Sequence, residues 1–121
     1  MSIPFKETMT FNERYAHSSS IRAKYPNSFP VILEKSTRDK ILTPLTKIKY
    51  LMPAGITIID CLQILRKRLK LNQYLSVNIY CSDHNIILSG SNSIEYLYKE
   101  YANEDGFLYL EYCGANTFGC N

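Results

Sequence analysis

The sequence lacks a C-x-x-C pair, an apolar stretch long enough to span a bilayer and an amino-terminal secretory signal. Without closely spaced cysteines no zinc site is indicated, and without a secretory signal we expect reduced thiols at Cys61, Cys81, Cys113 and Cys120. The longest uncharged apolar run covers residues 51–59, whereas a transmembrane helix needs roughly 20 residues. Any attachment to a membrane is therefore expected to be peripheral or covalent.

An excess of one charge sign is also missing. Fourteen Lys and Arg against eleven Asp and Glu leave a net charge of +3, which is too small to indicate a nucleic-acid partner. The basic run at residues 66–70 is typical of a solvated helix face. The only histidines, His17 and His84, are expected to be solvated, and neither stands in a context typical of Cys–His or Ser–His–Asp catalysis. The sequence therefore predicts a protein that is not an enzyme, with no metal site and no cofactor.

Hydrophobic patterning predicts one domain that contains several short strands. Residues 75–81 alternate strictly between apolar and polar side chains, with Tyr80 on the polar side, which is typical of a half-buried strand. Residues 36–46 form a polar connection that contains Pro44. The other predicted strands cover residues 29–35, 47–52 and 107–112, and a shorter run covers residues 86–88.

Helices are predicted in three places. Thr57 and Asp60 have the spacing of a capping box with Asp in place of the usual Glu. An apolar stripe at helical spacing follows, formed by Ile58, Leu62, Leu65 and Leu69. A shorter helix is marked by Ile94, Leu97, Tyr98 and Tyr101. The segment before Tyr25-Pro26 is helix-compatible but has only a weak apolar face, so it is expected to dock on another part of the protein.

The core order is strand, strand, helix, strand, short helix, strand. Two antiparallel strands followed by a crossover helix and further strands are typical of an α+β roll of the ubiquitin kind, with the helix on one face of a mixed sheet. Fold alone does not determine function.

Several segments resemble one family, the autophagy ubiquitin-like modifiers, which include the GABA-receptor-associated protein and the microtubule-associated light chain. The resemblance implies a ubiquitin-like β-grasp roll in which residues 1–26 form a helical extension and residues 27–119 form the core and tail. It covers nearly the whole chain, through Phe11-Asn12-Glu13-Arg14, Ile21-Arg22-Ala23-Lys24-Tyr25-Pro26, Pro30-Val31-Ile32-Leu33-Glu34-Lys35, Lys49-Tyr50-Leu51-Met52-Pro53, Leu65-Arg66-Lys67-Arg68, Glu104-Asp105-Gly106-Phe107-Leu108-Tyr109 and Asn116-Thr117-Phe118-Gly119.

The resemblance implies covalent attachment to a membrane lipid through Gly119. A processing cysteine protease would recognise Phe118 and remove residues 120–121, and ubiquitin-like activating and conjugating enzymes would join Gly119 to phosphatidylethanolamine. Glycine suits this role because a residue without a side chain can thread a narrow channel and expose its carbonyl. The free monomer is expected in the cytoplasm and the lipidated form on autophagosomes or related vesicles. Conjugation to protein lysines, or an unconjugated peptide-binding module in vesicle trafficking, remain alternatives.

The resemblance also implies that receptor and adaptor peptides of the form W/F/Y-x-x-L/I/V dock as an added strand beside the second strand. Lys47 and Arg68 would lie near the peptide. A first pocket would consist of Ile21, Pro30, Ile32, Lys49, Leu51 and Phe107. A second pocket would consist of Tyr50, Met52, Pro53, Ile56, Cys61 and Ile64. Lysines on a strand edge also have a purely structural use, because they discourage aggregation.

The sequence departs from the family pattern near these pockets. Cys61 replaces a usual phenylalanine, His17 a common acidic residue and Ser28 a common basic one. Residues 82–93 lack the usual Pro-Pro and form a longer loop. These differences are expected to alter which peptides bind.

Overall fold

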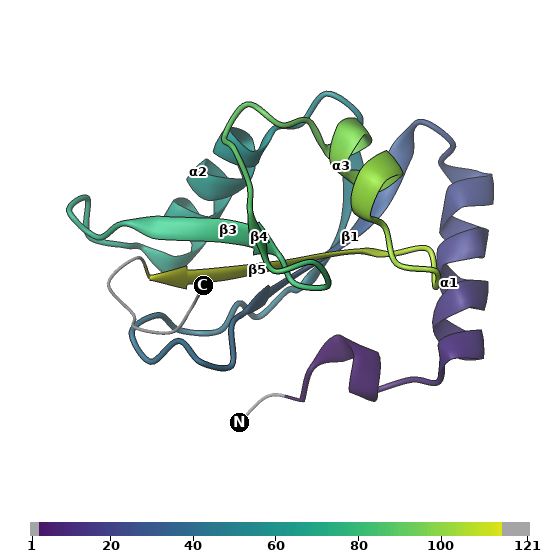
Figure 1. Cartoon of the computed structure of the whole chain (residues 1–121), viewed down its shortest axis with the longest axis horizontal. Coiled ribbons are helices and arrows are strands. Elements are labelled where there is room, and N and C mark those ends of the chain that lie inside the picture. Colours follow the sequence, from purple (N-terminus) through teal and green to yellow (C-terminus); the bar gives the residue numbers. More distant parts are fainter. Residues whose placement is uncertain (1–2, 115–121) are drawn as a thin grey trace.

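The computed structural model describes residues 3–114, in which helices and strands alternate along the chain (Figure 1). The order confirms the predicted α+β arrangement, with a short 3-10 helix added before the amino-terminal helix. The elements are η1 (Phe5–Glu7), α1 (Phe11–Lys24), β1 (Ser28–Lys35), β2 (Lys49–Pro53), α2 (Ile58–Leu69), β3 (Val77–Cys81), β4 (Ile86–Ile87), α3 (Ile94–Tyr101) and β5 (Leu108–Gly114).

The five strands of this region form one mixed sheet in the order β2-β1-β5-β3-β4. β1 pairs with β5 in parallel, and every other neighbouring pair is antiparallel. Val31 lies opposite Tyr50 of β2 on one side and Leu108 of β5 on the other, so the central strand aligns both neighbours. The sheet places β2 at one edge and the two-residue β4 at the other.

The main core lies between the sheet and α2. Thr57 accepts from the backbone of Asp60 and the Asp60 side chain accepts from the backbone of Thr57, which confirms the predicted capping box. Ile58 and Leu65 of the predicted stripe are at most 1% exposed, and they pack with sheet residues such as Val31 and Ile79. Burial of this apolar face stabilises α2 on the sheet.

A second, smaller cluster covers the opposite face of the sheet. Phe5 of η1 packs against Phe107 with ring centroids 5.2 Å apart, and Ile32 and Tyr109 complete the cluster. In Figure 1, η1 lies below the sheet and α2 above it. The amino-terminal extension therefore supplies an apolar side chain to a face that the ubiquitin-like core leaves uncovered.

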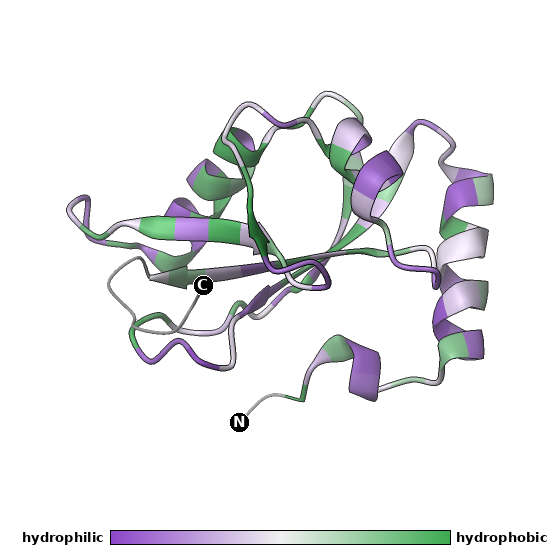
Figure 2. Ribbon diagram, in the orientation of Figure 1, coloured by the Kyte–Doolittle hydropathy of each residue, from purple (hydrophilic) through white to green (hydrophobic). Residues whose placement is uncertain are grey.

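Polar contacts attach α1 to the sheet. Ser18 is its one buried residue, and its hydroxyl donates to the backbone oxygen of Asp105 at 2.5 Å. The carboxylate of Asp105 is paired with Arg14 of the same helix. Gly106 adopts a φ of +91°, and a Cβ there would lie 2.1 Å from the Ser18 hydroxyl, so only glycine permits this close approach. In Figure 2 the hydrophobic residues of α1 are interrupted by hydrophilic ones along the ribbon.

Two expectations about polarity were wrong. The connection at residues 36–46 is not simply polar, because Leu42 and Leu45 are buried in the core and Asp39 is buried beside them. Tyr80, expected on the exposed face of its strand, is 3% exposed and packs against Cys113. Both differences arise because residues 36–46 pack against the sheet. Leu42 and Leu45 enter the core, and the side chains of Ser36 and Arg38 reach the Tyr80 hydroxyl, which the alternation along one strand cannot reveal. Within residues 3–114 no helix combines the length and apolar character needed to cross a bilayer.

Candidate peptide-docking site

The outer edge of β2 is open to an added strand. The backbone N–H of Leu33 donates to the oxygen of Ile48 at 2.8 Å, which fixes which residues of the second strand bond to β1. Because antiparallel strands alternate their hydrogen bonds, the backbone groups of Lys49 and Leu51 point away from β1. An edge with outward N–H and C=O groups is the feature that β-strand addition requires.

The predicted first-pocket residues come together on the face flanked by η1 and α1. Strand register sets Ile32 opposite Lys49 and Pro30 opposite Leu51. Ile32 and Phe107 are fully buried, Pro30 is buried, and Leu51 is 40% exposed. The half-buried Ile21 belongs to α1. The group therefore has a closed apolar floor, and Leu51 supplies the exposed apolar surface at the strand edge.

His17 lies beside this group, as its position among the departures from the family pattern implied, but its contact with Lys49 was not predicted. Its Nε2 is 3.1 Å from the Nζ of Lys49, and its ring meets that of Phe107 edge-on with centroids 6.0 Å apart. Burial lowers the pKa of His17, and the positive charge of Lys49 lowers it further. The expectation of a merely solvated histidine was wrong because its partner is 32 positions away in the sequence.

Of the predicted second-pocket residues, Tyr50, Met52, Ile56 and Cys61 pack in the main core on the α2 face. Cys61 is fully buried, with its Sγ 3.8 Å from the Sδ of Met52. Pro53 is exposed, while Ile56 and Ile64 are half-buried. Burial raises the pKa of the Cys61 thiol to about 11, which confirms its reading as a small apolar side chain. The buried sulfur pair belongs to the main core, and the half-buried isoleucines leave apolar surface accessible.

The side chains of Lys47 and Arg68 both lie close to the aromatic ring of Tyr50. The Lys47 ammonium is 5.0 Å and the Arg68 guanidinium 5.7 Å from the ring centroid. The Tyr50 hydroxyl donates to the backbone oxygen of Lys47 at 2.7 Å, which fixes the ring between them. Both cations line a cavity of about 500 Å³ that also contains Lys70. The two basic residues named from sequence therefore belong to one cationic cleft.

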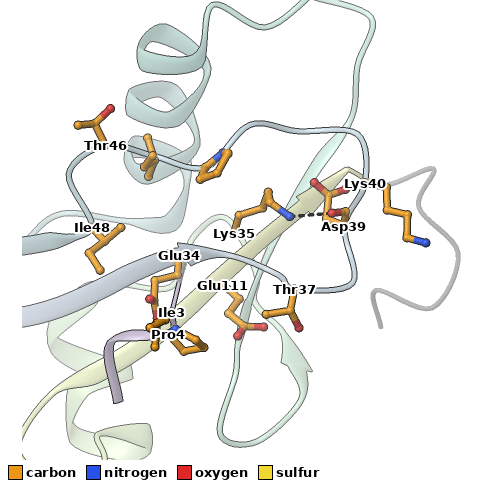
Figure 3. A pocket seen from close by; sticks show the side chains of 12 residues that line it. Ile3, Pro4, Glu34, Lys35, Thr37, Asp39, Lys40, Thr46, Ile48 and Glu111 are labelled. Atoms are coloured by element: carbon orange, nitrogen blue, oxygen red, sulfur yellow. Dashed lines mark hydrogen bonds between the residues drawn. The ribbon is translucent and has the colours of Figure 1, made fainter. Parts of the chain in front are cut away.

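A larger cavity, of about 800 Å³, lies on the η1 side of the sheet (Figure 3). Its floor carries Glu34 and Glu111, which face each other in the parallel register of β1 and β5. Glu34 accepts from the backbone N–H of Phe5 at 2.9 Å, and Glu111 accepts from the Tyr80 hydroxyl at 2.8 Å. Burial raises the pKa of Glu34, and Glu111 adds to the effect. No sequence pattern signalled this cavity, because four separate segments build its walls.

The remaining predictions concern metal binding, the other cysteines and the carboxyl-terminal tail. Across residues 3–114 no group of three or more His, Cys, Asp or Glu side chains is arranged to hold a metal ion. Cys81 and Cys113 are buried, as expected. Gly119 and Phe118 lie outside the described residues.

Comparison with known proteins identifies the family. Residues 13–119 match the family described as autophagy protein Atg8, ubiquitin-like. This chain belongs to the Atg8 family. It is therefore a ubiquitin-like protein with a role in autophagy, and proteins of this family act as modifiers and not as enzymes.

Individual relatives cover nearly the whole chain. Human microtubule-associated protein 1 light chain 3 gamma is 37% identical over 97% of this chain and 79% of its own length. Autophagy-related protein 8 of Mycosarcoma maydis is 38% identical over 98% of both chains. The crystal structure of Trypanosoma brucei ATG8 superposes with a TM-score of 0.85 at 31% identity, covering 98% of this chain and 100% of the other. The fold, including the amino-terminal helical part, is shared with that protein.

Proposed function

We propose that this Atg8-family protein docks W/F/Y-x-x-L/I/V peptides along β2 and is conjugated through Gly119 to phosphatidylethanolamine. The peptide would extend the sheet at its open edge, with the aromatic side chain on the Leu51 side and the aliphatic one on the α2 side. Processing would place the protein on autophagosomes or related vesicles, where docked receptors and adaptors are recruited. Free protein would be a cytoplasmic monomer.

The observation that supports peptide docking is the outward-facing backbone of Lys49 and Leu51, which lies between the first-pocket and second-pocket groups. Strand addition obtains affinity from main-chain hydrogen bonds and specificity from alternate side chains, which fall on opposite faces of the sheet. Lys49 and Leu51 of the first group and Tyr50 and Met52 of the second lie on opposite faces of β2, as this spacing requires. The cationic cleft of Lys47 and Arg68 adds attraction for acidic residues beside the motif.

Calorimetry with an aromatic-x-x-aliphatic peptide tests docking. The double variant Lys49→Ala and Leu51→Ala is expected to bind at least about tenfold more weakly, a loss of about 1.4 kcal/mol, because it removes a cation and the exposed apolar edge. A matched control carries Lys99→Ala and Ile87→Ala, which remove an exposed lysine and an exposed aliphatic residue away from β2. Equal affinities for the two double variants would reject the docking site.

Intact-mass measurement tests conjugation. Incubation with the family's processing protease is expected to remove Cys120 and Asn121, and the conjugate is expected to carry the mass of phosphatidylethanolamine. Gly119→Ala should leave the fold intact and abolish the membrane-bound form, whereas Asn121→Ala, beyond the cut, should be processed normally. Lipidation that persists in Gly119→Ala would refute the assignment. A conjugate with the mass of another protein would favour the lysine-linked alternative.

A further inference from the structure

Among residues 3–114, the side chain of Lys49 makes one hydrogen bond, and its partner is an uncharged base. An ammonium has donors alone, so at 3.1 Å its Nζ donates to the Nε2 of His17, which must then be deprotonated. No ion pair of residues 3–114 includes Lys49. His17 therefore orients the ammonium at the mouth of the first-pocket group without neutralising it.

Among residues 3–114, Lys49 is the charged group that acts on the pKa of His17. On α1, Glu13 one turn earlier accepts from the backbone of Thr10 at 2.8 Å, and Arg14 is paired with Asp105. On β2 the facing charge is Lys49 itself. On the β5 side the facing side chain is Phe107, which does not titrate.

We propose that His17 is a specificity-determining positioning residue of the docking edge. It takes up a proton when a peptide carboxylate reaches Lys49. The preference for acidic over neutral peptides therefore grows as the pH falls. The inference rests on the proposed docking function and names the feature of the partner that His17 reads, an acidic residue beside the aromatic anchor. In the neutral state His17 holds Lys49 ready, and in the protonated state it adds a second cation for the same carboxylate.

The direction of the pH dependence follows from the linkage between proton uptake and peptide binding. Without peptide, burial and Lys49 hold the pKa of His17 below its ordinary value, so the free protein carries a neutral imidazole at pH 7.5. A peptide carboxylate near Lys49 favours the imidazolium and raises that pKa. Binding then takes up a proton, and affinity for the acidic peptide rises as the pH falls toward the pKa of the free protein. A peptide without the carboxylate lacks this contribution.

Two peptides that differ only in the three residues before the aromatic anchor, Asp in one and Ser in the other, test the inference. Calorimetry at pH 7.5 and pH 5.5 gives the ratio of their affinities at each pH. For the unmodified sequence the ratio is expected to shift toward the acidic peptide by at least about threefold, since a pKa rise of half a unit corresponds to that factor.

Variants of both histidines separate this effect from general pH dependence. His17→Gln keeps an acceptor for Lys49 but cannot be protonated, so its affinity ratio is expected to be the same at both pH values. His84→Gln is the matched control, because His84 is the one other histidine of the sequence and packs against Tyr101, and it should retain the shift. NMR titration of the unmodified protein, which needs no variant, should show a higher His17 pKa with the acidic peptide than with the neutral one.

The outcomes distinguish the inference from the function on which it rests. If the neutral peptide does not bind at pH 7.5, both fall. If both peptides bind but their affinity ratio does not change with pH, or changes equally in His17→Gln, the inference alone is overturned. An identical His17 pKa with both peptides would also overturn it.

Discussion

The two longer helices, α1 and α2, are held to the sheet by different forces. Ile58, Cys61 and Leu65 of α2 are at most 1% exposed and belong to the main core. By contrast, α1 buries a single serine. It is held by Ser18 and Arg14, which share the partner Asp105, and by Arg22, which donates to the backbone oxygen of Ser28. Both helices begin with a complete capping box, so their local starts are equivalent. Only their attachment to the sheet differs.

Because of this difference, α2 contributes to the global stability of the protein, whereas α1 is able to open locally. Apolar burial makes α2 part of the cooperative unit that unfolds with the sheet. A few polar contacts allow α1 to open without the rest, as regions with few buried apolar contacts do in general. Since α1 carries Ile21 and His17, the first-pocket group is expected to adapt more easily than the second. Changes in α2 should then affect global unfolding alone, while changes in α1 should also alter local opening.

The largest effect is expected from Leu65→Ala. Leu65 is fully buried in the main core, and removing a buried leucine side chain costs about 2–5 kcal/mol through lost burial and the cavity left behind. Urea denaturation should show this loss in the free energy of unfolding. Hydrogen exchange of α1 amides should not change, because their opening leaves α2 folded.

Gln63→Ala provides the control on the same helix. Gln63 is exposed, and surface changes of this kind usually lie within about 0.5 kcal/mol. A similar loss for Gln63→Ala and Leu65→Ala would contradict the account of how α2 is held.

Arg14→Gln is expected to have an intermediate effect. It removes the charged partner of Asp105, and hydrogen bonds to charged groups contribute about 1.5–3 kcal/mol. Exchange of α1 amides should accelerate by a factor of about 10 or more, since 1.4 kcal/mol corresponds to tenfold. Lys67→Gln, which removes one cation from the exposed side of α2, is the matched control and should leave α1 exchange unchanged. Equal acceleration by both variants would show that the ion pair does not hold α1.

Local features were predictable from the sequence, and contacts between distant segments were not. The Thr57–Asp60 cap spans three positions, and the apolar stripe that follows it includes Ile58 and Leu65, which are buried as expected. The ion pair of Arg14 with Asp105 joins positions 91 apart, and no pattern within either segment indicates it.

The candidate site shows the same division. The resemblance to the Atg8 family supplied the pocket residues, and in the structure β2 carries Lys49 and Leu51 of the first set and Tyr50 and Met52 of the second on its two faces. It could not place His17 against Lys49, because the family's common acidic residue is absent there and a lone histidine on a polar helix gives no signal of its own. The cavity over Glu34 and Glu111 depends on the parallel register of β1 and β5, which alternation within one strand does not determine.

The smallest effects should come from the two caps, which makes them the sharpest comparison of the helices. Thr10→Ala and Thr57→Ala each remove an N-cap worth about 1 kcal/mol. Both should lower the free energy of global unfolding by a similar amount. Only Thr10→Ala should speed exchange of α1 amides, about fivefold. Opening of α1 already breaks the Thr10 cap, so the variant destabilises the closed form but not the α1-open form. The Thr57 cap is intact in both forms, so its loss does not change the opening of α1. If Thr57→Ala speeds α1 exchange equally, the two helices open together and the polar attachment of α1 gives it no independence.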